Sequence, residues 1–142
     1  MPSKSTSQTI LITGATGLVG GGLARYFASR GHRIVLTARD RGRLLELSSQ
    51  LADAPAYEAD LADAMSLERL LARMEADGIA PDVLINNAAD VTSKPLLDSS
   101  LDEIDRIIQV NVTGTLQLCR LLGRCMATRG AGAIVNVSSL SG

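Results

Sequence analysis

Short runs of aliphatic and β-branched residues alternate along this chain with longer segments whose leucines recur at helical spacing. The apolar runs lie at residues 9–13, 33–38, 56–59, 82–86 and 133–138. Near-continuous apolar runs joined by helices are typical of parallel strands that are covered on both faces. Because crossovers between parallel strands are right-handed, the pattern predicts an α/β fold with a doubly wound parallel sheet, Rossmann-like, with five strands present.

The segments between the runs carry helix start and stop signals. Asp40 is suited to cap the helix that follows it, and Gly31 and Gly78 stand where two other helices would end. A longer helix is predicted from about residue 101 to residue 128. The polar segment 90–100 before it is the longest candidate loop, and such loops often border a ligand.

Size and charge limit the classes of function. A chain of 142 residues fits one domain, residues 1–142, and its net charge of −1 gives no reason to expect nucleic acid or a membrane as partner. The polar N-terminus and the lack of a long apolar run lead us to expect a cytoplasmic protein. No metal site is expected, because the chain has one histidine, His32, and two cysteines, Cys119 and Cys125.

A glycine-rich turn, "TGATGLVG", lies between the first predicted strand and the first helix. Gly14, Gly17 and Gly20 would allow a tight turn and a close approach of backbone N–H groups to an anion. The helix N-terminus adds a partial positive charge. Placed after the first strand of such an alternation, this turn predicts that a dinucleotide diphosphate binds here.

Five motifs in this order make the chain resemble the short-chain dehydrogenase/reductase family. The resemblance implies a small-molecule alcohol or carbonyl substrate, further C-terminal strands, and a homo-oligomer at full length. The motifs are "TGATGLVG" at 13–20, "DL" at 60–61, "NNAA" at 86–89, "NVTGT" at 111–115 and "IVNVSS" at 134–139.

Two departures from the family pattern leave the branch open. Leu18 stands where the commonest single-domain branch has its middle glycine, and Ala89 replaces the glycine of the usual NNAG. The TGxxGxxG spacing is more typical of the extended branch, which often acts on nucleotide sugars. A nucleotide-sugar epimerase or dehydratase is therefore the alternative function.

The end of the second predicted strand bears on the choice of dinucleotide. An acid at this position binds the 2′-hydroxyl of NAD, whereas an arginine suits the 2′-phosphate of NADP. Ala38 stands where the family's NAD enzymes usually carry the acid, and Arg39 follows it. We therefore expect NADP(H) as cofactor, with NAD as the less favoured choice.

The resemblance also assigns the remaining cofactor contacts. It implies that Asp60 accepts a hydrogen bond from the adenine amino group and that Leu61 contributes its backbone N–H. Asn87, Ala88 and Ala89 would line the ribose beside the nicotinamide half. The complete predicted cofactor site is Gly14, Thr16, Gly17, Leu18, Val19, Gly20, Arg39, Asp60, Leu61, Asn87, Ala88, Ala89 and Val110.

The predicted catalytic residues are Ser139 and Asn111, both by resemblance. The serine would hydrogen-bond the substrate oxygen, and the asparagine would hold a water linked to a lysine. The family's proton donor, a tyrosine four residues before that lysine, has no counterpart, because the only tyrosines are Tyr26 and Tyr57. We therefore interpret the chain as the N-terminal portion of an NADP(H)-dependent oxidoreductase, with a non-catalytic dinucleotide-binding half-domain as a further alternative.

Overall fold

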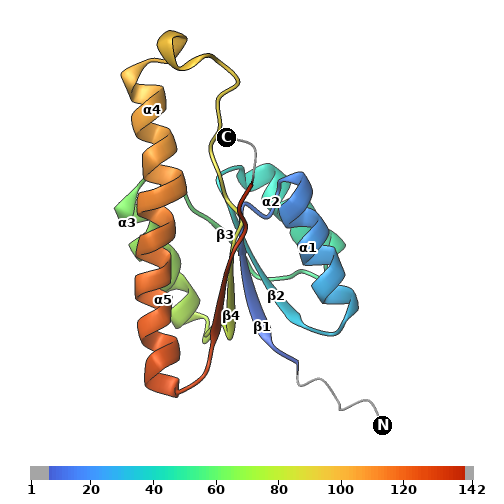
Figure 1. The fold of residues 1–142 in the computed structure, drawn as a ribbon. Coiled ribbons are helices and arrows are strands. Elements are labelled where there is room, and N and C mark those ends of the chain that lie inside the picture. The colour runs from blue at the N-terminus through green and yellow to red at the C-terminus, as the bar shows by residue number, and fades with distance from the viewer. Residues whose placement is uncertain (1–6, 140–142) are drawn as a thin grey trace.

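Five parallel strands form one sheet in the computed structural model, which describes residues 7–139 (Figure 1). The spatial order is β3-β2-β1-β4-β5, and the predicted doubly wound α/β fold is confirmed. The strands are β1 (Thr9–Thr13), β2 (Arg33–Ala38), β3 (Ala56–Glu58), β4 (Val83–Asn86) and β5 (Ala133–Asn136). The helical elements are α1 (Leu18–Ser29), α2 (Arg41–Gln50), α3 (Ala64–Ala76), η1 (Leu96–Asp98), α4 (Leu101–Ile108), η2 (Gln109–Gly114) and α5 (Thr115–Arg129).

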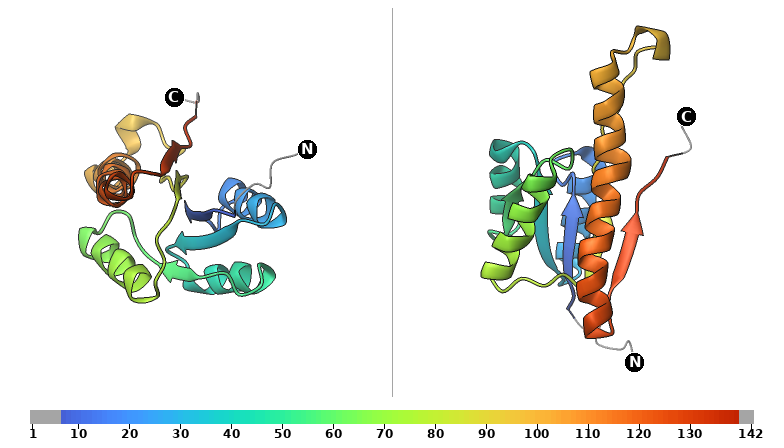
Figure 2. Two further views of the ribbon diagram at one scale, coloured as in Figure 1. Left: turned by 90° about the horizontal axis from the view of Figure 1, so that it is seen from below. Right: turned by 90° about the vertical axis from the view of Figure 1, so that its left-hand side faces the viewer.

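Helices cover the two faces of the sheet in two layers. Figures 1 and 2 show α1 and α2 on one face, and α3 with the long α4–α5 helix on the other. Successive residues of β1 point to opposite faces, so Ile10 and Ile12 belong to the core under α1 and α2, while Leu11 belongs to the core under α3 and α5. Strand β1 is thus buried on both sides, as its continuous apolar run predicts.

Local signals fix most of the element ends. The side chain of Asp40 accepts a hydrogen bond from the Arg43 N–H at 3.0 Å, so the predicted cap of α2 is confirmed. Gly31 and Gly78 follow α1 and α3 with φ of +83° and +66°, values that favour glycine. No helix within residues 7–139 is long and apolar enough to cross a bilayer.

Two predicted boundaries need correction. Strand β5 ends at Asn136 and not at Ser138, because its partner strand β4 ends at Asn86, which is paired with Asn136. The predicted long helix is not regular, because η2 is a π-helical turn inserted between α4 and α5. At the end of this turn, a Cβ on Gly114 would lie 2.2 Å from the Leu61 carbonyl oxygen, so only glycine allows this approach.

The strand order reverses between β1 and β4. In doubly wound sheets, ligands bind outside the carboxyl ends of the strands at such a reversal. Because all five strands are parallel, the turn after β1, the segment after β4 and Ser139 after β5 lie at the same edge of the sheet. The fold therefore brings the glycine turn and the predicted catalytic serine to one edge.

Candidate functional site

Two glycines of the "TGATGLVG" turn occupy positions where a side chain does not fit. Gly14 has a φ of +62°, and a Cβ on it would lie 2.7 Å from the Ala88 Cα. A Cβ on Gly20 would lie only 2.3 Å from the Gly14 carbonyl oxygen. These contacts press the turn, the first turn of α1 and the segment after β4 together at the switch point.

Hydrogen bonds join the ends of β1 and β4. The hydroxyl oxygen of Thr13 accepts the N–H groups of Asn87 and Ala88, each at 3.0 Å. The side-chain amide of Asn87 donates back to the carbonyl oxygens of Thr13 at 3.0 Å and Gly14 at 3.2 Å. The Asn87 side chain thus stabilises the backbone conformation of the turn at Thr13 and Gly14.

The first turn of α1 opens toward the same edge. Gly17 is the N-cap and has no side chain with which to cap the helix, so the first N–H groups of α1 lack a capping side chain. Leu18 at the start of the helix is 96% exposed. This helix end supplies the N–H donors and the partial positive charge that an anion requires.

A groove of about 730 Å³ runs along the carboxyl edge of the sheet. Every predicted cofactor residue except Gly20 lines it, and Gly20 lies behind the turn against Gly14. Its volume falls within the range of roughly 300–1,000 Å³ that is usual for ligand sites. The groove is also lined by Ala38, Asp40, Arg43, Ala59 and Val91.

Two arginines and two aspartates form a chain of ion pairs at the groove. The Arg106 guanidinium donates to both oxygens of Asp60 at 3.2 Å, and its Nε donates to Oδ2 of Asp90 at 2.9 Å. The same oxygen of Asp90 accepts from Nη1 of Arg39 at 3.3 Å. Burial alone would lower the pKa of Arg106, but its hydrogen bonds to Asp60 and Asp90 outweigh this effect and raise it.

Asn111 lies in η2 and fixes the segment after β4. Its Oδ1 accepts the backbone N–H of Asp90 at 2.7 Å, and its Nδ2 donates to the carbonyl oxygen of Asp90 at 2.8 Å. Both the oxygen and the nitrogen of the Asn111 amide therefore bond the backbone of Asp90. The π-helical turn thus places this side chain against the loop that borders the groove.

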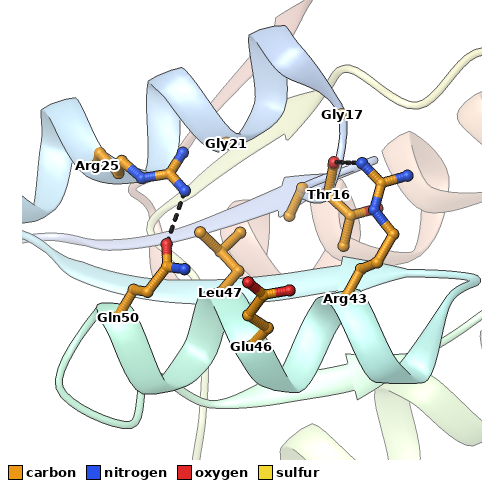
Figure 3. Close-up of a pocket in the computed structure, with 9 residues that line it drawn as sticks. Thr16, Gly17, Gly21, Arg25, Arg43, Glu46, Leu47 and Gln50 are labelled. Atoms are coloured by element: carbon orange, nitrogen blue, oxygen red, sulfur yellow. Dashed lines mark hydrogen bonds between the residues drawn. The ribbon is translucent and has the colours of Figure 1, made fainter.

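A second, smaller cavity of about 140 Å³ lies between α1 and α2 behind the glycine turn (Figure 3). Nη2 of Arg43 donates to the Thr16 carbonyl oxygen at 3.0 Å, and Nη2 of Arg25 donates to Oε1 of Gln50 at 2.8 Å. Arg43 lines both cavities, and its bond to Thr16 places a second guanidinium beside the glycine turn.

The two tyrosines lie away from the serine. The Tyr57 hydroxyl donates to Asp77 at 2.6 Å, and burial together with this hydrogen bond raises the pKa of Tyr57 to about 12. Tyr26 lies on α1 and is half exposed. Neither tyrosine hydroxyl is therefore positioned to donate a proton beside Ser139.

Within residues 7–139, no group of three His, Cys, Asp or Glu side chains could hold a metal ion.

Sequence reasoning missed Asp90 and Arg106 as members of the site. Asp90 directly follows "NNAA" at the end of β4, so its place at the groove could have been read from the motif. Arg106 gives no such signal, because its contacts join residues that are 16 and 46 positions away in the chain.

The reversal of strand order, the glycine turn and the groove beside it define a doubly wound α/β protein of the Rossmann type. The family model described as "short chain dehydrogenase" matches residues 8–142. The chain belongs to this family, so the resemblance inferred from its motifs is confirmed.

Several relatives are oxidoreductases by name. "Carbonyl reductase [NADPH] 2" of Sus scrofa is 35% identical over 132 residues, which are 92% of this chain and 52% of that protein. "Probable oxidoreductase EphD" of Mycobacterium tuberculosis is 32% identical over 137 residues, or 93% of this chain and 23% of that protein. The solved structure "Short-chain dehydrogenase from Sphingobium yanoikuyae in complex with NADPH" is 36% identical with a TM-score of 0.84, covering 94% of this chain and 54% of that one.

The chain spans about half the length of most of these relatives, or less. The groove and its ion pairs lie inside the shared part. The predicted site residues therefore lie in the part that this chain shares with its relatives, and the activity of the whole protein is a matter for proposal.

Proposed function

We propose that this chain forms the NADP(H)-binding portion of an oxidoreductase that interconverts an alcohol and a carbonyl compound. The observation that carries this proposal is the groove at the β1/β4 switch point, with Arg39 and Arg43 beside the end of β2. Ala38 leaves no carboxylate at the last position of that strand, where NAD enzymes bind the ribose 2′-hydroxyl. Relatives named for NADPH support the same choice.

The groove fits a dinucleotide in its chemistry. The N-terminus of α1 and the glycine turn would hold the diphosphate, because their N–H groups are accessible and side chains are excluded at Gly14 and Gly20. Asp60 would receive the adenine amino group, and Arg39 with Arg43 would bind the 2′-phosphate. When bound, the nicotinamide supplies or accepts the hydride.

Ser139 would act on the substrate side of the groove. It follows β5 at the edge where the glycine turn lies, so its hydroxyl is suited to donate a hydrogen bond to a carbonyl oxygen. Asn111 would hold the border of the site in place through its two bonds to the Asp90 backbone. In this proposal Asn111 positions the groove, besides the role with water that the family resemblance implies.

Turnover also requires a proton donor. Because Tyr57 is bonded to Asp77 and Tyr26 lies on α1, we expect residues 1–142 alone to bind cofactor without reducing a ketone. This expectation keeps a dinucleotide-binding half-domain as the second candidate. The relatives named above favour carbonyl chemistry over the nucleotide-sugar alternative. A homo-oligomer and a cytoplasmic location stay predictions.

Cofactor titrations with Arg39→Ala test the proposal. We expect the parent protein to bind NADPH at least tenfold more tightly than NADH, because one charge-assisted phosphate contact contributes roughly 1.5–3 kcal/mol. Arg39→Ala removes most of this preference. Arg41→Ala is the matched control, because Arg41 carries the same charge two residues on and is not among the residues that line the groove. Equal affinities for the two cofactors in the parent protein would refute the NADP assignment.

A further inference from the structure

Asp90 lies beside the groove and contacts two guanidinium groups, one of which, Arg39, lines it. Its Oδ2 accepts from Arg106 at 2.9 Å and from Arg39 at 3.3 Å. Arg39 is the side chain to which the proposed function gives the 2′-phosphate. A carboxylate of this chain therefore holds the guanidinium that the phosphate would need.

The two ion pairs of Asp90 differ in how readily they open. The Arg39 side chain is 55% exposed, and its contact with Asp90 is the longer of the two. An ion pair with such an exposed partner contributes little, about 0–1 kcal/mol. The Arg106 side chain is less exposed, and its guanidinium also donates hydrogen bonds to both oxygens of Asp60. Arg39 can therefore leave Asp90 while Arg106 keeps the carboxylate paired.

The backbone of Asp90 is held in place, in contrast to the Arg39 side chain. Asn111 bonds both the N–H and the carbonyl oxygen of Asp90, so the carboxylate stays at the groove when Arg39 turns away. A 2′-phosphate bound to Arg39 would then lie one guanidinium away from a fixed negative charge. That charge opposes the phosphate twice, first as a competitor for Arg39 and then by repulsion.

Resting on the proposed function, we propose that Asp90 is a specificity-determining residue that weakens binding of the 2′-phosphate and so limits the preference for NADP over NAD. The residue acts mainly through Arg39, because it pairs with the guanidinium that would otherwise be available to the phosphate. The carboxylate that follows "NNAA" thereby sets how far the arginine after β2 can favour NADP.

The variant Asp90→Asn tests this role, because it removes the charge and keeps the size and an acceptor for Arg106. Isothermal titration calorimetry would use ADP-ribose and 2′-phospho-ADP-ribose, which differ only in the phosphate and occupy only the described groove. We expect the ratio of their dissociation constants to shift about three- to tenfold toward the phosphorylated ligand, as loss of one weak ion pair and one repulsion implies. Asp90→Ser, which also removes the charge, should shift the ratio in the same direction.

Two comparisons separate this effect from general changes in charge. In an Arg39→Ala background, Asp90→Asn should change the ratio by clearly less than in the parent protein, because the competition for Arg39 is gone and only the repulsion remains. Asp98→Asn removes a charge from η1, and within residues 7–139 Asp98 pairs with neither Arg39 nor Arg106, so this control should leave the ratio unchanged. Far-ultraviolet circular dichroism confirms that each variant is folded.

The outcomes distinguish the two proposals. If Arg39→Ala reduces the preference for 2′-phospho-ADP-ribose but Asp90→Asn and Asp90→Ser leave that preference unchanged or reduce it, the role of Asp90 is refuted and the NADP site stands. If Arg39→Ala leaves the ratio of the parent protein unchanged, the NADP assignment fails, and the role of Asp90 fails with it.

Discussion

Two neighbouring strands of the same sheet, β4 and β5, differ sharply in how well they are covered. Leu84 of β4 is 0% exposed, whereas Ile134, its register partner on β5, is 36% exposed. The inner strands have helices on both faces, but the described contacts of β5 are with β4 and with α5 on one face. The glycine turn of the groove follows the inner strand β1, whereas Ser139 follows the more exposed edge strand β5.

Under the proposed function, this difference means that cofactor binding and the role of Ser139 would depend on different parts of the fold. The glycine turn and the segment after β4 follow strands whose side chains belong to the buried core on both faces of the sheet. The position of Ser139 depends on a strand that is anchored mainly by pairing with β4. We therefore expect the groove to tolerate changes in β5 that would disturb the serine.

The largest expected effect is the difference in unfolding free energy between a variant of β4 and a variant of β5. Leu84→Ala should lower the free energy of unfolding by about 2–5 kcal/mol, because it removes a fully buried side chain. Ile134→Ala, at the paired position on β5, should cost about 1 kcal/mol, because much of that side chain is already in water. Urea denaturation of both variants makes the measurement. Equal losses of unfolding free energy in the two variants would show that Ile134 is buried as fully as Leu84, which would contradict the difference between the two strands.

A somewhat smaller effect breaks the covered region at the glycine turn. Gly20→Ala should destabilise the protein by about 1–3 kcal/mol and weaken NADPH binding at least tenfold, because a Cβ would collide with the Gly14 carbonyl oxygen. Gly22→Ala is the matched control two residues along the same helix, where a Cβ would meet no described atom within 4 Å. It should raise stability by up to about 1 kcal/mol. Similar behaviour of the two variants would contradict the close packing at the turn.

The smallest effect compares β5 with the opposite edge strand, β3, through the pH dependence of stability. Tyr57 of β3 is buried, and its pKa is raised from 10.0 to about 12. The folded state therefore holds this proton more tightly, so the stabilisation is complete below pH 10 and is lost as the pH rises toward 12. The loss should be about 1–2 kcal/mol, because the hydroxyl lies at the edge of the core.

Denaturation curves between pH 9 and pH 12 would detect this loss, and Tyr57→Phe should flatten the dependence. Tyr26→Phe is the control, because Tyr26 is half exposed. A pH dependence that is equally steep in the parent protein and in Tyr57→Phe would show that burial and the hydrogen bond to Asp77 do not raise the pKa of Tyr57 as described.

Much of the fold follows from local patterns in the sequence. The apolar runs predicted the five strands, and Asp40 and Gly31 predicted the ends of helices, because caps and stop signals act within a few residues. The extra turn at η2 was not predicted. At its end Gly114 lies against the Leu61 carbonyl oxygen, a contact between residues far apart in the sequence.

The groove was predicted by motif and position, and the ion pairs along it were not. Arg39 could be assigned to a phosphate because it follows a strand whose end lies at the binding edge. The contacts of Asp90 and Arg106 depend on how η2 places Asn111 against the loop after β4. Such contacts arise only from the assembled fold, so periodicity and spacing do not report them.

The most direct test of the groove is a map of backbone amide chemical shifts during titration with NADP⁺. The largest changes should fall at residues 14–19, 60–61 and 87–89, which surround the switch point. Another cavity, of about 420 Å³, lies between α3 and α5 and is lined by Leu71 and Leu122 among others. Changes concentrated there, with residues 14–19 unaffected at saturating NADP⁺, would contradict a dinucleotide site at the carboxyl edge of the sheet.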